Sequence, residues 1–410
     1  MSRDGVYSPR RLSPLLQDDL VPNSRRTSKW RMASAIAWIG TVQGFLLNLV
    51  GFISGPIYDM GHIKPLIYGG GLLNVLGLVA TSFASQYAWA FLSLGVCVGL
   101  GSGLLYVPSV AIVATYFTTK RPLATGISAT GSSIGGVLYP VLFRVLVDRV
   151  GFSWACRSFA FINGGLLITC CLLIAPRVVP FSKRRIFATG ALRDFPFLLF
   201  STALFLLWLG VDVPFFFLPS FIQERLNSSA ELGDYLLSAM SASSLFGRVL
   251  LGLVASNITP LGVWQASIGA SCVLLFCWAT IGNLPGIVAF VIFYGFFTGG
   301  VISLVSPVLL VISPDLSIVG SRLGMSSIFS GLGFLVGPPI SGAIQKGAVG
   351  YCGQSAFAGS TYLVAFAIVV VVGWRHRRST SRDEHHNDGN TQSVDVPKIT
   401  VVVLRKERKS

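Results

Sequence analysis

Two ionisable side chains stand inside long apolar stretches of the chain, where a charge is normally excluded. Asp212 lies between Gly210 and Pro214, which would loosen a helix at that point, and Arg248 lies in the next apolar stretch. A buried carboxyl can take up and release a proton, whereas a guanidinium can donate two parallel hydrogen bonds to a carboxylate. Asp212 and Arg248 are therefore the best candidates for functional groups, and Asp212 is a candidate for proton exchange.

The composition predicts that these groups are held by membrane-spanning helices. Hydrophobic residues make up 52% of the chain, charged residues 11%, and the mean hydropathy is +0.70. No Asp, Glu, Lys or Arg occurs between Lys64 and Lys120 or between Arg248 and Asp315. Each gap is long enough for at least two crossings of about 20 residues. We therefore expect an all-α membrane protein that crosses the bilayer many times.

Eleven stretches have membrane length, five before a basic linker and six after it. They are residues 33–55, 66–85, 88–117, 122–147, 152–175, 195–222, 232–255, 261–282, 285–312, 320–346 and 353–374. Residues 1–32 contain no apolar run suited to a signal peptide or a span. The expected organisation is a polar basic tail (1–32), a five-span bundle (33–175), a cytoplasmic linker (176–194), a six-span bundle (195–374) and a disordered cytoplasmic tail (375–410).

Charge placement and motif content exclude several classes of protein. Of the 31 basic residues, 7 lie in residues 1–32, 5 in 176–194 and 9 in 374–410, so the net charge of +15 flanks the spans. This pattern follows the positive-inside rule and argues against nucleic-acid binding. The cysteine spacing matches no metal site or disulfide pattern, and no catalytic motif occurs. We expect no enzyme, metal or cofactor, and the bilayer and a small solute as partners.

Features that recur at an offset of about 200 residues predict duplicated halves. The matched pairs are Arg121 with Arg322, Gly131 with Gly333, Gly135 with Gly337, and Pro108 with Pro307. Small residues four apart let helix backbones approach closely, so these helices are expected to line the contact between the halves. Ordinary packing of small residues within a bundle is the alternative interpretation.

The same offset predicts twelve spans, of which the first is missing. The second half begins its first span near residue 195, so the counterpart would end near residue 20. That stretch contains six charged residues, Arg3, Asp4, Arg10, Arg11, Asp18 and Asp19. Each charge at the centre of a span costs roughly 3 kcal/mol. Eleven spans with a cytoplasmic carboxyl end would also place residues 1–32 outside, in conflict with their positive charge.

Three further motifs are specific enough to compare with known families. They are Gly-Leu-Gly-Ser-Gly-Leu-Leu-Tyr-Val-Pro at 99–108, Gly-Ser-Ser-Ile-Gly-Gly at 131–136 and Gly-Phe-Ser-Trp-Ala-Cys-Arg at 151–157. Together they resemble fungal members of the monocarboxylate porter family of the major facilitator superfamily. The resemblance implies two six-helix bundles with alternating access to a central site. The implied function is secondary transport of a monocarboxylate or related organic anion, with proton symport as an option.

The segment 55–64 resembles the cytoplasmic loop motif of the superfamily. It reads Gly-Pro-Ile-Tyr-Asp-Met-Gly-His-Ile-Lys. The resemblance implies that Gly55, Pro56 and Gly61 shape a tight turn, and that Asp59 meets a helix N-terminus across the two bundles as a latch. The basic residue that usually follows the acid is absent, which leaves Lys64 as the cation. Alternatively, Asp59 only caps its own turn.

The resemblance also bears on the two membrane charges. Animal members carry an Asp–Arg pair in the eighth helix, where the arginine receives the solute carboxylate. Here Arg248 keeps the arginine position, whereas Ser244 replaces the acid. Fungal members share this pattern, which favours a latch at the cytoplasmic end of the helix; both roles stay open. Asp212 is either a coupling group or a solvated charge near the outer surface, because the aromatic run 215–217 is typical of an interface.

Two alternatives to organic-anion transport follow from the sequence. The first is export of a hydrophobic metabolite or drug through an apolar cavity, for which the available aromatics are Phe215, Phe216, Phe217, Phe296 and Phe297. The second is a non-transporting remnant or sensor, which the missing helix favours. A plasma-membrane location is preferred to an internal membrane. Asn227 begins a glycosylation sequon in a predicted outer loop.

Overall fold

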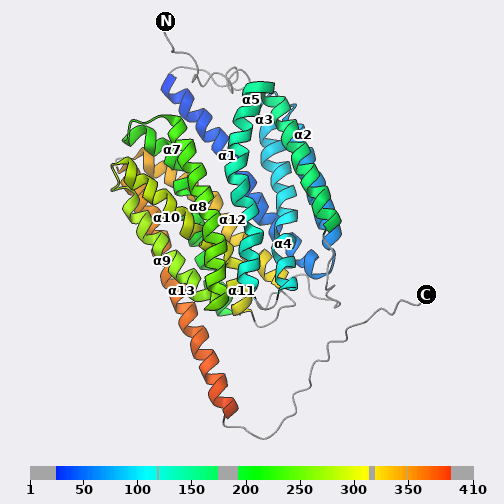
Figure 1. The fold of residues 1–410 in the computed structure, drawn as a ribbon, viewed down its shortest axis with the longest axis vertical. Coiled ribbons are helices and arrows are strands. Elements are labelled where there is room, and N and C mark those ends of the chain that lie inside the picture. The colour runs from blue at the N-terminus through cyan, green and yellow to red at the C-terminus, as the bar shows by residue number, and fades with distance from the viewer. Residues whose placement is uncertain (1–24, 118–119, 174–192, 314–318, 348, 389–410) are drawn as a thin grey trace, which may run out of the picture.

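The chain folds into helices throughout the part that the structure describes. This is a computed structural model that describes residues 25–117, 120–173, 193–313, 319–347 and 349–388 (Figure 1). Its elements are α1 (Arg25–Asp59), α2 (Ile63–Thr81), α3 (Tyr87–Ala90), the π-helical η2 (Phe91–Cys97), α4 (Val98–Tyr116), α5 (Arg121–Leu173), α6 (Phe195–Gly210), α7 (Val213–Arg225), α8 (Ala230–Asn257), α9 (Pro260–Trp278), α10 (Leu284–Ser303), α11 (Val305–Ile312), α12 (Val319–Lys346) and α13 (Gly350–Asp388). No strand occurs among these residues, which confirms the all-α fold class.

Ten helical segments among the described residues are long and apolar enough to cross a membrane. Three of them join elements end to end: α3, η2 and α4; α6 and α7; α10 and α11. Helix α5 has 53 residues, which is roughly 80 Å at about 1.5 Å per residue, against a hydrocarbon core of about 30 Å. It reverses direction at Gly151, whose φ of 80° suits glycine (Figure 1). Because α5 therefore crosses twice, the segments match the eleven predicted spans.

The helix boundaries differ from the prediction at both ends. Helix α1 begins at Arg25, inside the predicted polar tail, and α13 continues to Asp388, inside the predicted disordered tail. Residues 25–32 and 375–388 contain neither Pro nor Gly, the strongest helix breakers, so nothing stops each helix earlier. The span expected to be missing and residues 176–192 of the linker lie outside the described residues.

Two helix pairs form the seams between the halves, α1 with α12 and α5 with α8. In the first, the backbones of Gly51 and Gly324 touch, since a Cβ at Gly324 would lie 2.7 Å from the Gly51 oxygen. In the second, Gly126 lies in the same way against the carbonyl of Arg248. The residues that meet in one seam correspond to those that meet in the other. Gly51 of α1 corresponds to Arg248 of α8, 197 positions later, and Gly126 of α5 corresponds to Gly324 of α12, 198 positions later. The two seams thus repeat at the offset that the sequence predicts for duplicated halves.

The glycines predicted to line this contact lie elsewhere on the same helices. A Cβ at Gly131 would meet nothing within 4 Å, and Gly135 faces a side chain of its own helix. Gly333 and Gly337 pack against α6, which belongs to the same half. The prediction of the helices was correct, but the close approaches occur at Gly126 and its equivalents, because the faces that meet are set by the crossing of the helices.

The two prolines also differ in effect. Pro307 follows the break between α10 and α11, because a proline ring clashes with the carbonyl four residues earlier, here that of Ser303, the last residue of α10. Pro108 lies inside α4, which is continuous across it. The irregularity of the first half is instead the π-helical turn η2. The matched prolines, Pro108 and Pro307, therefore do not interrupt their helices in the same way.

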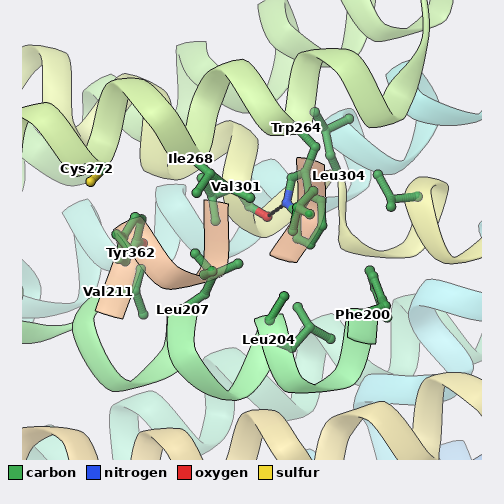
Figure 2. Packing of buried hydrophobic residues seen from close by; sticks show 14 of the residues in the cluster. Phe200, Leu204, Leu207, Val211, Trp264, Ile268, Cys272, Val301, Leu304 and Tyr362 are labelled. Atoms are coloured by element: carbon green, nitrogen blue, oxygen red, sulfur yellow. Dashed lines mark hydrogen bonds between the residues drawn. The ribbon is translucent and has the colours of Figure 1, made fainter. Parts of the chain in front are cut away.

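The best-packed core lies in the second half of the chain. The largest fully buried side chains, including Trp264, Trp278, Tyr294 and Tyr362, all belong to α6–α13. Figure 2 shows part of this core, where Nε1 of Trp264 donates a hydrogen bond of 2.9 Å to the Val301 carbonyl. The indole thus satisfies its polar atom while its ring fills the interior. This packing gives the second half a rigid frame for the groups described below.

Candidate solute-binding site

A cavity of about 230 Å³ lies between the two halves, and we call it the central cavity. Helices α1, α4 and α5 line it from the first half, and α6, α8, α10, α11 and α12 from the second. Its hydroxyl groups belong to Tyr106, Ser109, Thr125, Ser128, Ser132, Ser303, Ser306, Ser326, Ser327 and Ser330. Its apolar lining is Val107, Val110, Val113, Ala129, Trp208, Ile302, Val305 and Leu323. Asn48 and Arg248 complete it, and of these lining residues only Arg248 is charged.

Arg248 reaches from α8 across the seam to the other half. Its Nη1 donates hydrogen bonds to the carbonyl of Ala129 and to the hydroxyl of Ser132, both on α5. The residue is 6% exposed, and its Nε has no hydrogen-bond partner within the described part of the chain. Beside it, Ser133 donates to Ser244 at 3.4 Å. The arginine lies well inside α8, so it both lines the cavity and joins the halves.

Asp59, at the end of α1, caps the N-terminus of α12 across the two halves. Its Oδ1 accepts the backbone N–H of Gly320 at 3.1 Å, and its Oδ2 accepts the N–H of Ser321 at 2.7 Å and the Ser321 hydroxyl at 2.6 Å. A carboxylate is stabilised at this position by the helix dipole and by free backbone N–H groups. The turn of Gly61, with φ 87°, brings the acid into place. Lys64 is exposed and forms no ion pair among the described residues.

A second acid, which the sequence analysis did not single out, holds the same helix end. Asp194 precedes α6, and its Oδ2 accepts a hydrogen bond of 2.8 Å from Nη2 of Arg322 in the first turn of α12. Nη1 of Arg322 donates to Ser313 at 3.2 Å. The signal was present, because Asp194 stands directly before an apolar run, where a helix begins. Its pairing with a residue 128 positions away could not be read from the sequence.

Asp212 lies outside the central cavity, at the break between α6 and α7. Its Oδ2 is buried and has no hydrogen-bond partner within the described residues. The five phenylalanines expected to line an apolar cavity do not line this one either. Three of them follow the break at Asp212 and two lie in α10, and the lining residue nearest to Asp212 in the chain is Trp208, four positions earlier.

The sequence itself matches a family model over most of this architecture. Residues 32–283 and 203–408 match the model described as Major Facilitator Superfamily. The chain belongs to this superfamily. It is therefore a multi-pass membrane transporter of the major facilitator type, as the resemblance implied.

Named relatives agree with this assignment. The MFS-type transporter dbaD of Emericella nidulans is 32% identical over 83% of this chain and 77% of its own length. The fujikurins efflux protein of Gibberella fujikuroi is 34% identical over 82% of this chain and 73% of its own length. The aspyridones efflux protein apdF of Emericella nidulans is 34% identical over 76% of this chain and 64% of its own length.

A solved structure confirms the fold of this major facilitator. The crystal structure of the fucose:proton symporter FucP of E. coli superposes with a TM-score of 0.66 at 14% identity, over 83% of this chain and 92% of that chain. The superfamily prediction is thus confirmed. The narrower monocarboxylate porter assignment stays a prediction, because the relatives named above are described as MFS-type transporters or efflux proteins.

The glycosylation candidate of this major facilitator lies where a sugar could be attached. Asn227 is exposed in the turn between α7 and α8 and has a φ of 46°. Ser229, the third residue of the sequon, caps α8 by accepting the N–H of Leu232 at 3.3 Å. A second ion pair lies at this same end of the molecule, between Arg144 of α5 and Glu231 of α8 at 3.0 Å. Modification of Asn227 stays a prediction.

Proposed function

We propose that this transporter exports a small, largely apolar organic metabolite that carries an acidic group. The observation that carries the proposal is the single charge of the central cavity, the Arg248 guanidinium, among aromatic, aliphatic and hydroxyl side chains. Export is favoured because two relatives, whose alignments cover at least three quarters of this chain, are named as efflux proteins for aspyridones and fujikurins. Export from the cell requires a location in the plasma membrane.

The surroundings of Arg248 suit an anion. Its two hydrogen-bond partners, the Ala129 carbonyl and the Ser132 hydroxyl, are neutral, and its Nε is unpaired among the described residues. A buried cation without a counter-charge costs free energy, which a bound carboxylate or enolate would recover through charge-assisted hydrogen bonds. The rings of Tyr106 and Trp208 offer apolar surface for the remainder of the solute.

Transport by alternating access requires the contacts at one end of the molecule to open while those at the other close. At the end predicted to be cytoplasmic, Asp59 holds α12, and the Leu123 N–H of α5 donates to Ser256 of α8 at 3.1 Å. At the other end, Arg144 pairs with Glu231. We propose that the contacts at the cytoplasmic end form while the Arg144–Glu231 pair at the other end breaks as the solute is released. Arg248 lies between the two ends.

Binding of matched acids and esters to the purified transporter tests the proposal. We expect a panel of aromatic carboxylic acids, each compared with its methyl ester, to raise the melting temperature of the wild type only as the free acids. Arg248→Gln should lose at least about tenfold in affinity, because one charge-assisted bond contributes roughly 1.5–3 kcal/mol. Ser244→Ala, next to the arginine but outside the cavity lining, is the control.

The same panel separates the proposal from its alternatives. If esters bind as well as acids, the cargo is neutral and the role of Arg248 is structural. If only acids as short as acetate and lactate bind, the transporter carries simple monocarboxylates. Labelled acids that bind should then accumulate in wild-type inside-out vesicles, whose interior corresponds to the outside of the cell, at a faster rate than in vesicles with Arg248→Gln. Binding without any flux would contradict transport.

A further inference from the structure

We infer that Asp212 is the centre of a proton-binding site in the second half, separate from the cavity that receives the solute. The site consists of Asp212 at the α6–α7 break, Tyr294 and Thr298 on α10, and Tyr362 on α13. Its use in driving export rests on the proposed function, whereas proton binding itself does not. Four observations support it.

The first observation is the break in the helix. Helix α6 ends at Gly210 and α7 begins at Val213, so Asp212 occupies the junction, with Pro214 in the first turn of α7. Proline has no N–H to donate, which leaves the carbonyl four residues earlier, that of Gly210, without its helical partner. The next carbonyl, that of Val211, accepts a hydrogen bond of 2.8 Å from the hydroxyl of Tyr294. The phenol of α10 thus fixes the backbone next to the acid.

The second observation is a buried carboxyl oxygen without a partner, close to a group of buried hydroxyls. Asp212 Oδ2 is buried without a hydrogen-bond partner within the described part of the chain, and the hydroxyls of Thr298 and Tyr362 are buried beside that of Tyr294. Thr298 and Tyr362 are 0% exposed, and Tyr362 lies next to Val211 (Figure 2). Buried polar atoms are almost always paired in native proteins. The unpaired carboxyl oxygen beside these hydroxyls indicates that a proton binds there, because the protonated carboxyl can donate a hydrogen bond to them.

The third observation is the absence of a counter-cation at the junction. The titratable groups that interact with the acid are Tyr294 of α10 and Tyr362 of α13, and Cys272 of α9 lies next to the latter. On α8, Glu231 and Asp234 interact with Arg144. α12 touches α6 just before the junction through Gly337, which has no side chain. Neither ion pair among the described residues involves Asp212, and an isolated carboxylate inside a membrane is costly.

Asp59 provides the contrast within the same chain. Both of its oxygens accept hydrogen bonds from N–H or hydroxyl donors at 2.6 to 3.1 Å, which is the environment of a carboxylate that stays charged. Oδ2 of Asp212 receives none. The same type of side chain therefore has three hydrogen-bond donors at the latch, whereas at the α6–α7 junction one of its oxygens has none.

The fourth observation is the position of the site relative to the solute. Trp208 lies four residues before Asp212, in the last turns of α6, which ends at Gly210. Trp208 lines the central cavity and packs against Phe334 of α12, with ring centroids 6.1 Å apart. A proton that binds or leaves at Asp212 therefore acts four positions along the chain from a residue of the cavity wall.

Infrared difference spectroscopy of the purified, full-length transporter in liposomes tests the site without any solute. We expect the wild type at neutral pH to show the C=O band of a protonated carboxyl, and Asp212→Asn to lack it. Asp59→Asn should keep the band. Tyr362→Phe should shift the frequency of the band, because it removes a hydroxyl group close to the acid. The proposal is overturned if the Asp212→Asn spectrum retains the wild-type band, or if the band is absent from the wild type. Melting temperatures confirm that each variant is folded.

Transport measurements then test the link to export. Using an aromatic acid that the wild type carries, we expect Asp212→Asn to lose flux driven by a pH gradient by at least about tenfold while retaining exchange of labelled for unlabelled solute. Equal gradient-driven flux in the variant would overturn coupling through this residue. If the wild type carries no acid of the panel, the proposed function fails, and the infrared result alone decides the proton site.

Discussion

The Oδ2 atom of Asp59 lies 2.7 Å from the backbone nitrogen of Ser321, although 262 positions separate the two residues. This contact joins the last turn of α1 to the first turn of α12 and closes one end of the molecule. It requires a carboxylate at the end of one helix and unsatisfied N–H groups at the start of another. The contact is consequently sensitive to a change of charge that leaves the shape of the side chain unaltered.

Replacement of Asp59 by Asn should open this end of the transporter. The amide keeps one acceptor but loses the charge that interacts with the helix dipole, a change of about 1 kcal/mol, or roughly fivefold in the ratio of open to closed forms. Distance measurements between spin labels at His62 and Ile258, which lie at this end in opposite halves, report the shift. Lys64→Ala should leave the distances unchanged, because Lys64 forms no ion pair among the described residues. An unchanged distance distribution in Asp59→Asn would show that the latch does not hold the closed form.

The two ion pairs should differ in their contribution to stability. The pair of Arg322 and Asp194 has side chains 6% and 25% exposed, whereas that of Arg144 and Glu231 is 38% and 44% exposed. Asp194→Asn leaves a buried cation without its partner and should destabilise the protein by about 2 kcal/mol or more. Glu231→Gln should cost less than about 1 kcal/mol, since exposed pairs are screened by solvent. Melting temperatures of the two variants in detergent, at low and at high salt, measure the loss of stability. Equal losses in Asp194→Asn and Glu231→Gln would contradict this ranking.

Alanine at Gly324 should damage the α1–α12 seam. Its Cβ would lie 2.7 Å from the Gly51 oxygen, a backbone atom that cannot turn aside. We expect a loss of roughly 1–3 kcal/mol from overpacking, seen as a lower melting temperature. Gly131→Ala is the matched control, because nothing lies within 4 Å of the position of its Cβ. This control should be neutral or slightly stabilising, since alanine favours a helix.

Trp208→Ala should weaken solute binding more than truncation of any of the phenylalanines first considered for the cavity. The indole lines the central cavity, and an aromatic contact of this kind contributes roughly 1–1.5 kcal/mol, which is about tenfold in affinity. Phe216→Ala is the comparison, because Phe216 is 37% exposed and lies outside the cavity lining. Titration with an aromatic acid measures both. A larger effect at Phe216 would relocate the site.

Expression in a cell that glycosylates secreted proteins tests the topology. Asn227 and Asn257 each begin a sequon, and they lie at opposite ends of α8. If the carboxyl tail is cytoplasmic, Asn227→Gln should abolish the mobility shift caused by glycosylation, and Asn257→Gln should not. The reverse result would invert the orientation of every span.

The amino-acid sequence was sufficient for the spans but not for the contacts between them. The length and spacing of apolar stretches predicted eleven crossings, because a bilayer imposes one length on each helix. The contact of Asp59 with the other half was implied by the resemblance of residues 55–64 to the loop motif of the superfamily, because the residues alone allowed Asp59 to cap its own turn. The number of spans could be derived from local chemistry, whereas the partner of Asp59 could not.

The close approaches and the cavity lining depended on how the helices cross. The small-residue pattern identified α5 and α12 correctly, yet the touching glycines lie on other faces of these helices. Phe215 was a reasonable candidate for an apolar wall, but it lies beyond the break at Asp212, and the cavity is lined by Trp208, which precedes the break. Rotation of a helix about its own axis leaves almost no trace in a sequence that is apolar on all sides.

The duplicated seams differ at one matched pair of positions. Gly51 leaves the α1–α12 seam bare at the position where Arg248 ties α8 to α5. On the proposed function, an anion that enters the cavity would compete with Ala129 and Ser132 for the same guanidinium. Binding of the cargo would then release Arg248 from α5 and loosen the α5–α8 seam.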